Sequence, residues 1–139
     1  MNLLFYPGLD SADKQGGYDE INGAVGKAIK DLSRHHQEIF FRVKSFFEKL
    51  EKVANLQEYI KVGEIYQFPG SDLYEMRIPK QRRGGVFRIY FCFSLEKDGN
   101  RDLILLDAEL KHKKKPMRLE NAKSKLKEYY RTFGKEAQI

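Results

Sequence analysis

Hydrophobic side chains recur at spacings of three and four from residue 19 to residue 54, which is typical of amphipathic helices. From residue 72 to residue 111 they recur at every second position, the period of a strand with one buried face. The helical period returns after Pro116. Near the start, the apolar run Asn2–Tyr6 ends at Pro7 and Gly8, which predicts a first strand.

Two helical stripes meet near Ser33–His36, where no Gly or Pro marks a break. We expect two helices packed as a hairpin, and one long bent helix is the alternative. Residues 59–68 carry no clear pattern. The first stripe consists of Ile21, Val25, Ala28, Ile29 and Leu32, and the second of Ile39, Phe40, Val43, Phe46, Phe47, Leu50, Val53 and Ala54.

The alternating region predicts three strands, at Leu73–Ile78, Val86–Leu95 and Asp102–Lys111. Glycine-containing turns at residues 82–85 and 97–100 separate them, which favours antiparallel hairpins. The predicted order is β-α-α-β-β-β-α. This is an α+β fold with an N-terminal strand, a helical hairpin, a three-stranded antiparallel meander and a C-terminal helix, in a single domain over residues 1–139.

Alternation also sorts the strand residues onto two faces of the sheet. We expect one apolar face covered by the helices and one open, charged face. The predicted apolar face holds Tyr74, Met76, Ile78, Phe87, Ile89, Phe91, Phe93, Ile104, Leu106, Ala108 and Leu110; the predicted open face holds Glu75, Arg77, Arg88, Tyr90, Cys92, Asp107, Glu109 and Lys111.

Basic side chains are concentrated in the second half of the chain. The whole chain has 26 Lys and Arg against 20 Asp and Glu, yet residues 1–75 hold 9 basic and 12 acidic side chains and residues 76–139 hold 17 and 8. Such a local field attracts polyanions, and phosphate contacts supply most nonspecific affinity for nucleic acid. A solvated basic edge is the alternative, unless the basic segments converge in space.

Several classes of site are excluded by the residue types present. Cys92 is the single cysteine and the chain has three His, so we predict no metal and no cofactor. No P-loop, dinucleotide-binding glycine pattern or Ser-His-Asp set is found. The first ten residues do not read as a signal peptide and no apolar run is long enough for a membrane span, so we expect a soluble, cytoplasmic protein without membrane contact.

Three ordered motifs resemble the RelE/ParE toxin superfamily, and its HigB-like, phage-derived branch in particular. They are LYEMRIP at residues 73–79, FRIYF at residues 87–91, and Leu105-Leu106 followed by Lys111 and Lys115-Pro116. Residues 119–122 (LENA) stand where the family's last helix begins. The resemblance covers about residues 72–130, whereas the first seventy residues agree only in the order of their elements.

The resemblance implies the toxin of a type II toxin–antitoxin system, an endoribonuclease that cuts messenger RNA without a metal. Its implied partners are a cognate antitoxin and the ribosome, on which family members usually depend. In this chemistry the 2′-hydroxyl attacks the adjacent phosphate, with a base, an acid and cations assisting. A noncatalytic or gyrase-directed, ParE-like inhibitor and a degenerate nucleic-acid-binding homologue are the alternatives on the same fold.

The motifs place five catalytic candidates. Arg77 and Arg88 match the family's two strand arginines and would clamp phosphate, because the planar guanidinium binds two oxygens at once. Lys111 and His112 match the lysines after the last strand and would do acid/base or electrostatic work. Glu109 is a candidate base. The predicted RNA-binding residues are Arg82, Arg83, Tyr90, Lys113, Lys114 and Lys115, with Tyr90 stacking on a base or positioning a phosphate.

One segment departs from the family pattern. The family's His-Gly-Phe is replaced here by Asp107-Ala108-Glu109, and the segment from Lys111 to Pro116 is one residue shorter. Carboxylates beside a phosphate site repel the substrate unless one serves as the base. For Glu75, Asp107 and Glu109 we favour ion pairing over catalysis, and altered or lost activity remains an alternative.

Overall fold

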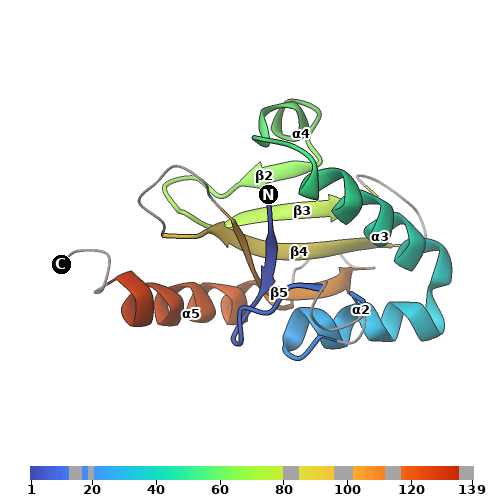
Figure 1. The fold of residues 1–139 in the computed structure, drawn as a ribbon, viewed down its shortest axis with the longest axis horizontal. Helices are drawn as coiled ribbons and strands as arrows, with labels where there is room; N and C mark the ends of the chain where they lie inside the picture. The colour runs from blue at the N-terminus through green and yellow to red at the C-terminus, as the bar shows by residue number, and fades with distance from the viewer. Residues whose placement is uncertain (13–16, 19–20, 80–84, 96–101, 112–116, 135–139) are drawn as a thin grey trace.

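The computed structural model describes residues 1–12, 17–18, 21–79, 85–95, 102–111 and 117–134. The fold is α+β, with helices packed on a five-stranded mixed sheet in the order β1-β5-β4-β3-β2 (Figure 1). The strands are β1 (Leu3–Phe5), β2 (Ile65–Gln67), β3 (Tyr74–Ile78), β4 (Val86–Phe93) and β5 (Leu103–Lys111). The helices are α2 (Ala24–His35), α3 (Gln37–Glu51), α4 (Gln57–Lys61) and α5 (Leu119–Tyr129), and a short π-helix, η1 (Tyr130–Gly134), follows α5.

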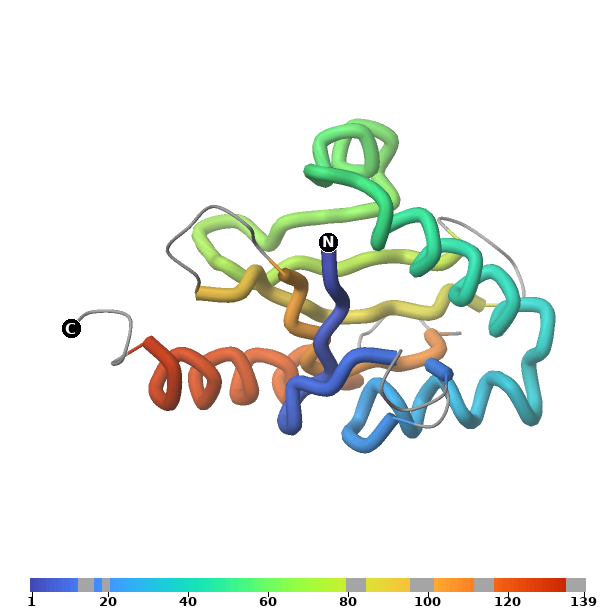
Figure 2. Tube along the Cα trace, in the orientation of Figure 1, coloured from blue at the N-terminus to red at the C-terminus, as the bar shows by residue number. Residues whose placement is uncertain are grey.

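The predicted antiparallel meander forms the centre of the sheet, and one short strand extends it on each side. β1 pairs in parallel with β5, so the start of the chain lies beside a strand one hundred residues later (Figure 2). On the other side, β2 pairs antiparallel with β3. The predicted order lacked β2 and α4, both of which fall in or next to the segment 59–68 that carried no clear pattern.

The helical stripe folds as two helices, which confirms the hairpin and excludes one bent helix. The break is at His36, whose φ of −143° and ψ of 62° interrupt the helical backbone. The His36 amide still donates to the Leu32 carbonyl, at 2.7 Å, and its carbonyl accepts from Phe40, at 3.0 Å. The change of direction lets α2 pack on β5 while α3 packs on β3.

The main core lies between this hairpin and one face of the sheet. Buried side chains from α2 and α3 meet alternate residues of β3 and β4, as the sequence pattern predicted. The buried helical residues are Val25, Ile29, Leu32, Ile39, Val43, Phe46, Phe47 and Leu50, and they pack on Met76, Ile78, Phe87, Ile89, Phe91, Leu103, Leu105 and Ala108.

A second core on the opposite face corrects the prediction of an open sheet. The β4–β5 register shifts at Tyr90 and Phe91, which pair with Asp107 and Leu105 and leave Leu106 as an extra residue. Because one extra residue reverses the alternation, Ile104 and Leu106 lie on the face opposite to the one predicted. The second core comprises Tyr6, Leu73, Tyr90, Cys92, Ile104, Leu106, Ala122 and Tyr129.

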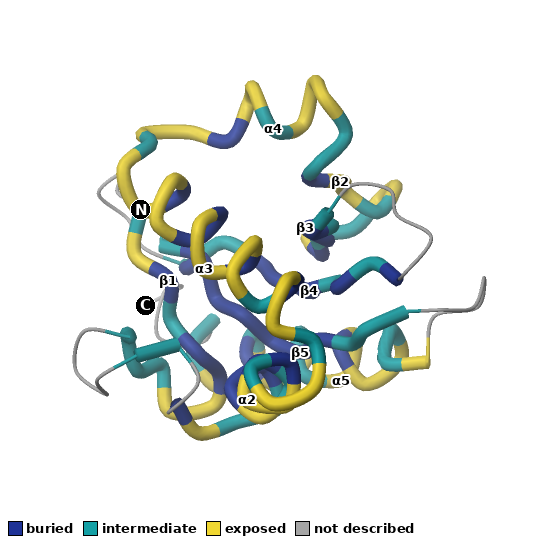
Figure 3. Tube along the Cα trace, turned by 90° about the vertical axis from the view of Figure 1, so that its right-hand side faces the viewer, coloured by how far each residue is buried: buried dark blue, intermediate teal, exposed yellow. Residues whose placement is uncertain are grey.

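Helix α5 covers this second core. Figure 3 shows α3 and α5 on opposite sides of β4 and β5. Ala122 and Tyr129 are the buried residues of α5, and the Tyr129 hydroxyl accepts a hydrogen bond from the Leu95 amide at 3.3 Å. Arg77, Arg88 and Lys111 on the polar face are only partly buried. Within the described residues, no helix combines the length and apolar character that crossing a membrane requires.

Candidate functional site

The strand register arranges the polar face in rows that run across the sheet. Arg77 of β3 lies opposite Arg88 of β4, which lies opposite Glu109 of β5. Lys111 follows two residues after Glu109 on β5 and therefore faces the same side, diagonal to Arg88. The sheet thus brings together three of the predicted catalytic cations, Arg77, Arg88 and Lys111, which we call the cation cluster.

Buried Glu75 holds the two arginines in place. It is 1% exposed, and its Oε1 lies 3.1 Å from Arg77 Nε and 2.8 Å from Arg88 Nη1. Like charges directly opposite each other on neighbouring strands repel, so this shared carboxylate compensates the pair. One carboxylate against two guanidinium groups leaves a surplus of positive charge at this end of the face.

The arginines differ in their exposure and contacts. The Arg88 side chain is 19% exposed, and its buried Nε has no hydrogen-bond partner within the described part of the chain. The Arg77 side chain is 33% exposed, and its guanidinium carbon lies 5.3 Å from the centre of the Tyr66 ring. A partly exposed guanidinium held by a carboxylate and an aromatic ring is positioned in advance for a phosphate oxygen.

Tyr66 is a candidate that sequence analysis missed. It lies on β2 opposite Glu75, on the polar face, and it is 40% exposed. An exposed aromatic ring beside guanidinium groups is a suitable surface for a nucleobase. The alternation of Ile65, Tyr66 and Gln67 was a signal, but three residues are too few to identify a strand.

The pKa of the Lys111 amine is lowered, as expected for an amine close to other cations. Desolvation lowers the pKa of its amine, and Arg88 and Arg77 lower it further, whereas Glu75 and Glu109 oppose the shift. An amine with a lowered pKa releases its proton more readily than an ordinary lysine does. Lys111 is therefore suited to donate a proton to a leaving oxygen.

Tyr90 does not have the predicted position on an open surface. Its exposed fraction is 0%, and its hydroxyl donates to Glu109 Oε2 at 3.0 Å. Burial and the adjacent Glu109 carboxylate raise the pKa of this phenol, so it stays neutral. A ring inside the second core cannot stack on a nucleotide, and we correct that prediction.

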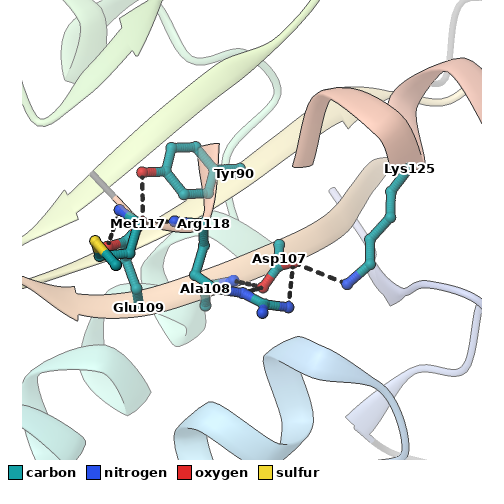
Figure 4. A network of polar contacts seen from close by, with 7 residues as sticks. All are labelled: Tyr90, Asp107, Ala108, Glu109, Met117, Arg118 and Lys125. Carbon is teal, nitrogen blue, oxygen red and sulfur yellow. Dashed lines mark hydrogen bonds and ion pairs between the residues drawn. The ribbon is translucent and has the colours of Figure 1, made fainter. Parts of the chain in front are cut away.

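The Glu109 carboxylate accepts hydrogen bonds that join β5 to the start of α5. Besides Tyr90, the Met117 amide donates to Oε1 at 2.9 Å and the Arg118 amide donates to Oε2 at 2.7 Å (Figure 4). Both oxygens of this carboxylate are therefore engaged by hydrogen-bond donors of the protein itself. These contacts favour a structural role over that of a base, but they are hydrogen bonds: the arginines that Glu109 was expected to pair with are held by Glu75.

Asp107 forms a second network, also drawn in Figure 4. It is 1% exposed, and Arg118 binds both of its oxygens, Nε to Oδ1 at 3.1 Å and Nη2 to Oδ2 at 2.8 Å. Lys125 of α5 adds a contact of 2.8 Å to Oδ2. These contacts raise the pKa of Arg118 and attach α5 to the sheet, so Asp107 is also committed to structure.

The remaining predicted site residues lie outside the described residues. These are Arg82, Arg83, His112, Lys113, Lys114 and Lys115. In the part of the chain that the structure describes, no group of three or more His, Cys, Asp or Glu side chains is placed to hold a metal ion.

In comparisons with known proteins, no family model matches the chain, no curated protein matches it, and no solved structure matches it. The geometry of the cation cluster and the sequence motifs therefore carry the functional inference.

Proposed function

We propose that this protein is the RNA-cleaving toxin of a type II toxin–antitoxin pair and that the cation cluster holds the scissile phosphate. The observation that carries the proposal is the pair Arg77 and Arg88, directly opposite each other and sharing a single oxygen of buried Glu75. The ordered motifs that resemble the RelE/ParE superfamily support it, as does a helical hairpin packed on an antiparallel meander. A RelE-like topology is part of the same proposal.

The proposed reaction needs no group beyond the chain and the RNA. The 2′-oxygen attacks the adjacent phosphorus, the bond from phosphorus to the 5′-oxygen breaks, and a 2′,3′-cyclic phosphate and a free 5′-hydroxyl result. Arg77 and Arg88 stabilise the charge that develops on the phosphoryl oxygens. Lys111 donates the proton that the 5′-oxygen acquires, which its lowered pKa favours.

The proton of the 2′-hydroxyl requires an acceptor, and here a second candidate function arises. Glu75, Asp107 and Glu109 are each engaged by cations or hydrogen-bond donors. Among the candidates for acid/base work, we therefore assign the base to His112, which lies outside the described residues. The commitment of all three carboxylates favours, as the alternative, a homologue that binds nucleic acid without cutting it.

The proposed partners follow from the proposed activity. A cognate antitoxin would neutralise the cation cluster, and an acidic segment laid across Arg77 and Arg88 is the simplest way to do so. The substrate is messenger RNA, with the ribosome as a further partner, and the site of action is the cytoplasm.

The test is induction of the protein in a bacterial host, with mapping of new RNA 5′ ends after a few minutes. The test variant is Arg88→Gln, because Arg77 still pairs with buried Glu75 after the change. The matched control is Arg34→Gln, which removes the same charge from an exposed position on α2. Circular dichroism and urea unfolding of both variants establish that they are folded.

We expect growth arrest and new 5′-hydroxyl ends inside reading frames for the wild type and Arg34→Gln, and neither for folded Arg88→Gln. Growth arrest with intact messages would move the target to a topoisomerase or another partner. Absence of both arrest and cuts, with retained RNA binding, would establish the noncatalytic alternative. Cleavage by folded Arg88→Gln at the wild-type rate would overturn the assigned role of the cation cluster.

A further inference from the structure

A second cationic feature lies next to the cation cluster, on the helical-hairpin side of the sheet edge. It is a pocket of about 370 Å³ between α3 and the last residues of β3. Arg42 and Lys49 of α3 line it together with Arg77 and Glu64. The Arg77 guanidinium is held on the polar face by Glu75, so Arg42 and Lys49 against Glu64 give the pocket its positive charge. Its volume is at the lower end of the range of small-molecule sites.

The pocket exists because β2 is shorter than β3. β2 pairs only with residues 74–76, so Arg77 and Ile78 extend past it along the sheet edge. The chain between α4 and β2 closes one side, since the Arg77 amide donates to the Glu64 carbonyl at 2.9 Å. Helix α3 runs past this end of β3 and supplies the other side (Figure 1).

The spacing of residues on α3 determines what the pocket presents. Arg42, Phe46 and Lys49 follow at intervals of four and three, so they lie on one side of the helix. Phe46 and Ile78 give the pocket an apolar wall between its cations. The ion pair of Arg42 with Glu38 is long, at 3.7 Å, and exposed, so it competes weakly with a ligand.

We propose that this pocket binds the nucleotide next to the phosphate held at the cation cluster, with Arg42 and Lys49 on its phosphate and its base against the apolar wall. The inference rests on the proposed function and specifies its substrate contacts. Arg77 connects the two places, because it pairs with Glu75 in the cluster and also lines the pocket. To reach the pocket from the cluster, a single RNA strand would pass around the edge of β3 at Arg77, which β2 leaves uncovered.

The experiment measures the affinity of a short, fluorescently labelled RNA whose 2′-oxygens are methylated, so that cleavage cannot occur. Arg42→Gln and Lys49→Gln remove one pocket charge each, from exposed positions that the fold does not need. Lys44→Gln is the matched control, because Lys44 is exposed on the same helix and does not line the pocket. Unlabelled adenosine 5′-monophosphate and inorganic phosphate serve as competitors.

We expect Arg42→Gln and Lys49→Gln each to weaken binding about fivefold, and Lys44→Gln less than twofold. The mononucleotide should displace the RNA at a lower concentration than inorganic phosphate does. Equal losses for all three variants, or equal competition by the two anions, would overturn the pocket as a nucleotide site. Loss of binding in Arg88→Gln alone would overturn this inference and leave the proposed function standing, whereas no binding by the wild type would overturn both.

Discussion

On the polar sheet face a buried carboxylate with two cations lies on each side of Tyr90, Glu75 on β3 and Asp107 on β5, and the two sites differ in what the cations do. Asp107 pairs with Arg118, the residue before α5, and with Lys125 of α5. Glu75 receives Arg77 and Arg88, which belong to the sheet itself. At Asp107 the cations attach α5 to the sheet. At Glu75 the cations lie on a part of the sheet surface where α5 does not pack.

This difference separates structural charge from charge that is available for a ligand. At Asp107 both carboxylate oxygens are engaged, and the helix that supplies the cations also covers Tyr90 and Cys92. At Glu75 two arginines share one oxygen, and Arg77 keeps a third of its side chain exposed. Counting basic residues in the sequence does not distinguish the two cases, because the distinction depends on where α5 packs.

We expect the largest loss of stability from a substitution of Asp107. Asp107→Asn leaves two cations beside a buried amide, which should lower the free energy of unfolding by about 2 to 3 kcal/mol. The loss stays below that of a fully buried pair because Arg118 and Lys125 are 42% and 25% exposed and can turn toward water. Urea unfolding at neutral pH measures it.

Glu120→Gln is the control for Asp107→Asn, since the pair of Glu120 with Lys123 is exposed and contributes little. The folded Asp107→Asn protein should bind RNA as the wild type does. An RNA affinity that falls together with stability would mean that the α5 side takes part in binding.

A smaller effect is expected at Glu109. Glu109→Gln replaces an oxygen acceptor by an amide nitrogen opposite the backbone donors Met117 and Arg118, and we expect a loss of about 1 to 2 kcal/mol. RNA cleavage by the folded variant should stay within about threefold of the wild type, because the account gives Glu109 no proton to accept from the substrate. A hundredfold loss of cleavage with unchanged substrate affinity would identify Glu109 as the base.

The smallest effect concerns Tyr6, whose hydroxyl donates to the Glu128 carboxylate of α5. Burial and this carboxylate raise the pKa of Tyr6 to about 12. An unfolded tyrosine ionises near about 10, so the contribution of Tyr6 to stability is complete below that pH and is lost as the pH rises toward 12. Tyr6→Phe should therefore flatten the alkaline decline in stability, measured by urea unfolding across this range. An unchanged decline would show that the contact does not hold α5.

Sequence periodicity predicted most of the fold because strands β3 and β4 alternate without interruption. Arg77 and Arg88 fall on one face by this rule, and the structure places them opposite each other. Lys111 also lies on the predicted face, because the bulge in β5 precedes it and it is two residues after Glu109, which faces the same side. The cation cluster was therefore accessible from sequence alone.

The C-terminal helix was predicted, but the bulge and the face of the sheet that this helix covers were not. One extra residue at Leu106 reverses the alternation, and β5 contains no Gly that would have indicated a bulge. Tyr90 alternates with core residues as an open-face residue should, yet α5 covers that part of the face. The partners of Asp107, Arg118 and Lys125, come from a segment whose contacts depend on tertiary packing, which periodicity does not encode.

The most direct test of the central claim is the salt dependence of RNA binding by the wild type, Arg88→Gln and Lys125→Gln. Each variant loses one cation that pairs with a buried carboxylate, Arg88 with Glu75 and Lys125 with Asp107. If phosphate binds at the cation cluster, Arg88→Gln makes the slope of log affinity against log salt shallower by about 0.7, the value for one phosphate contact on a single strand. Lys125→Gln should leave the slope unchanged. Equal slopes for Arg88→Gln and the wild type, or a loss at Lys125 as large as the loss at Arg88, would contradict the account.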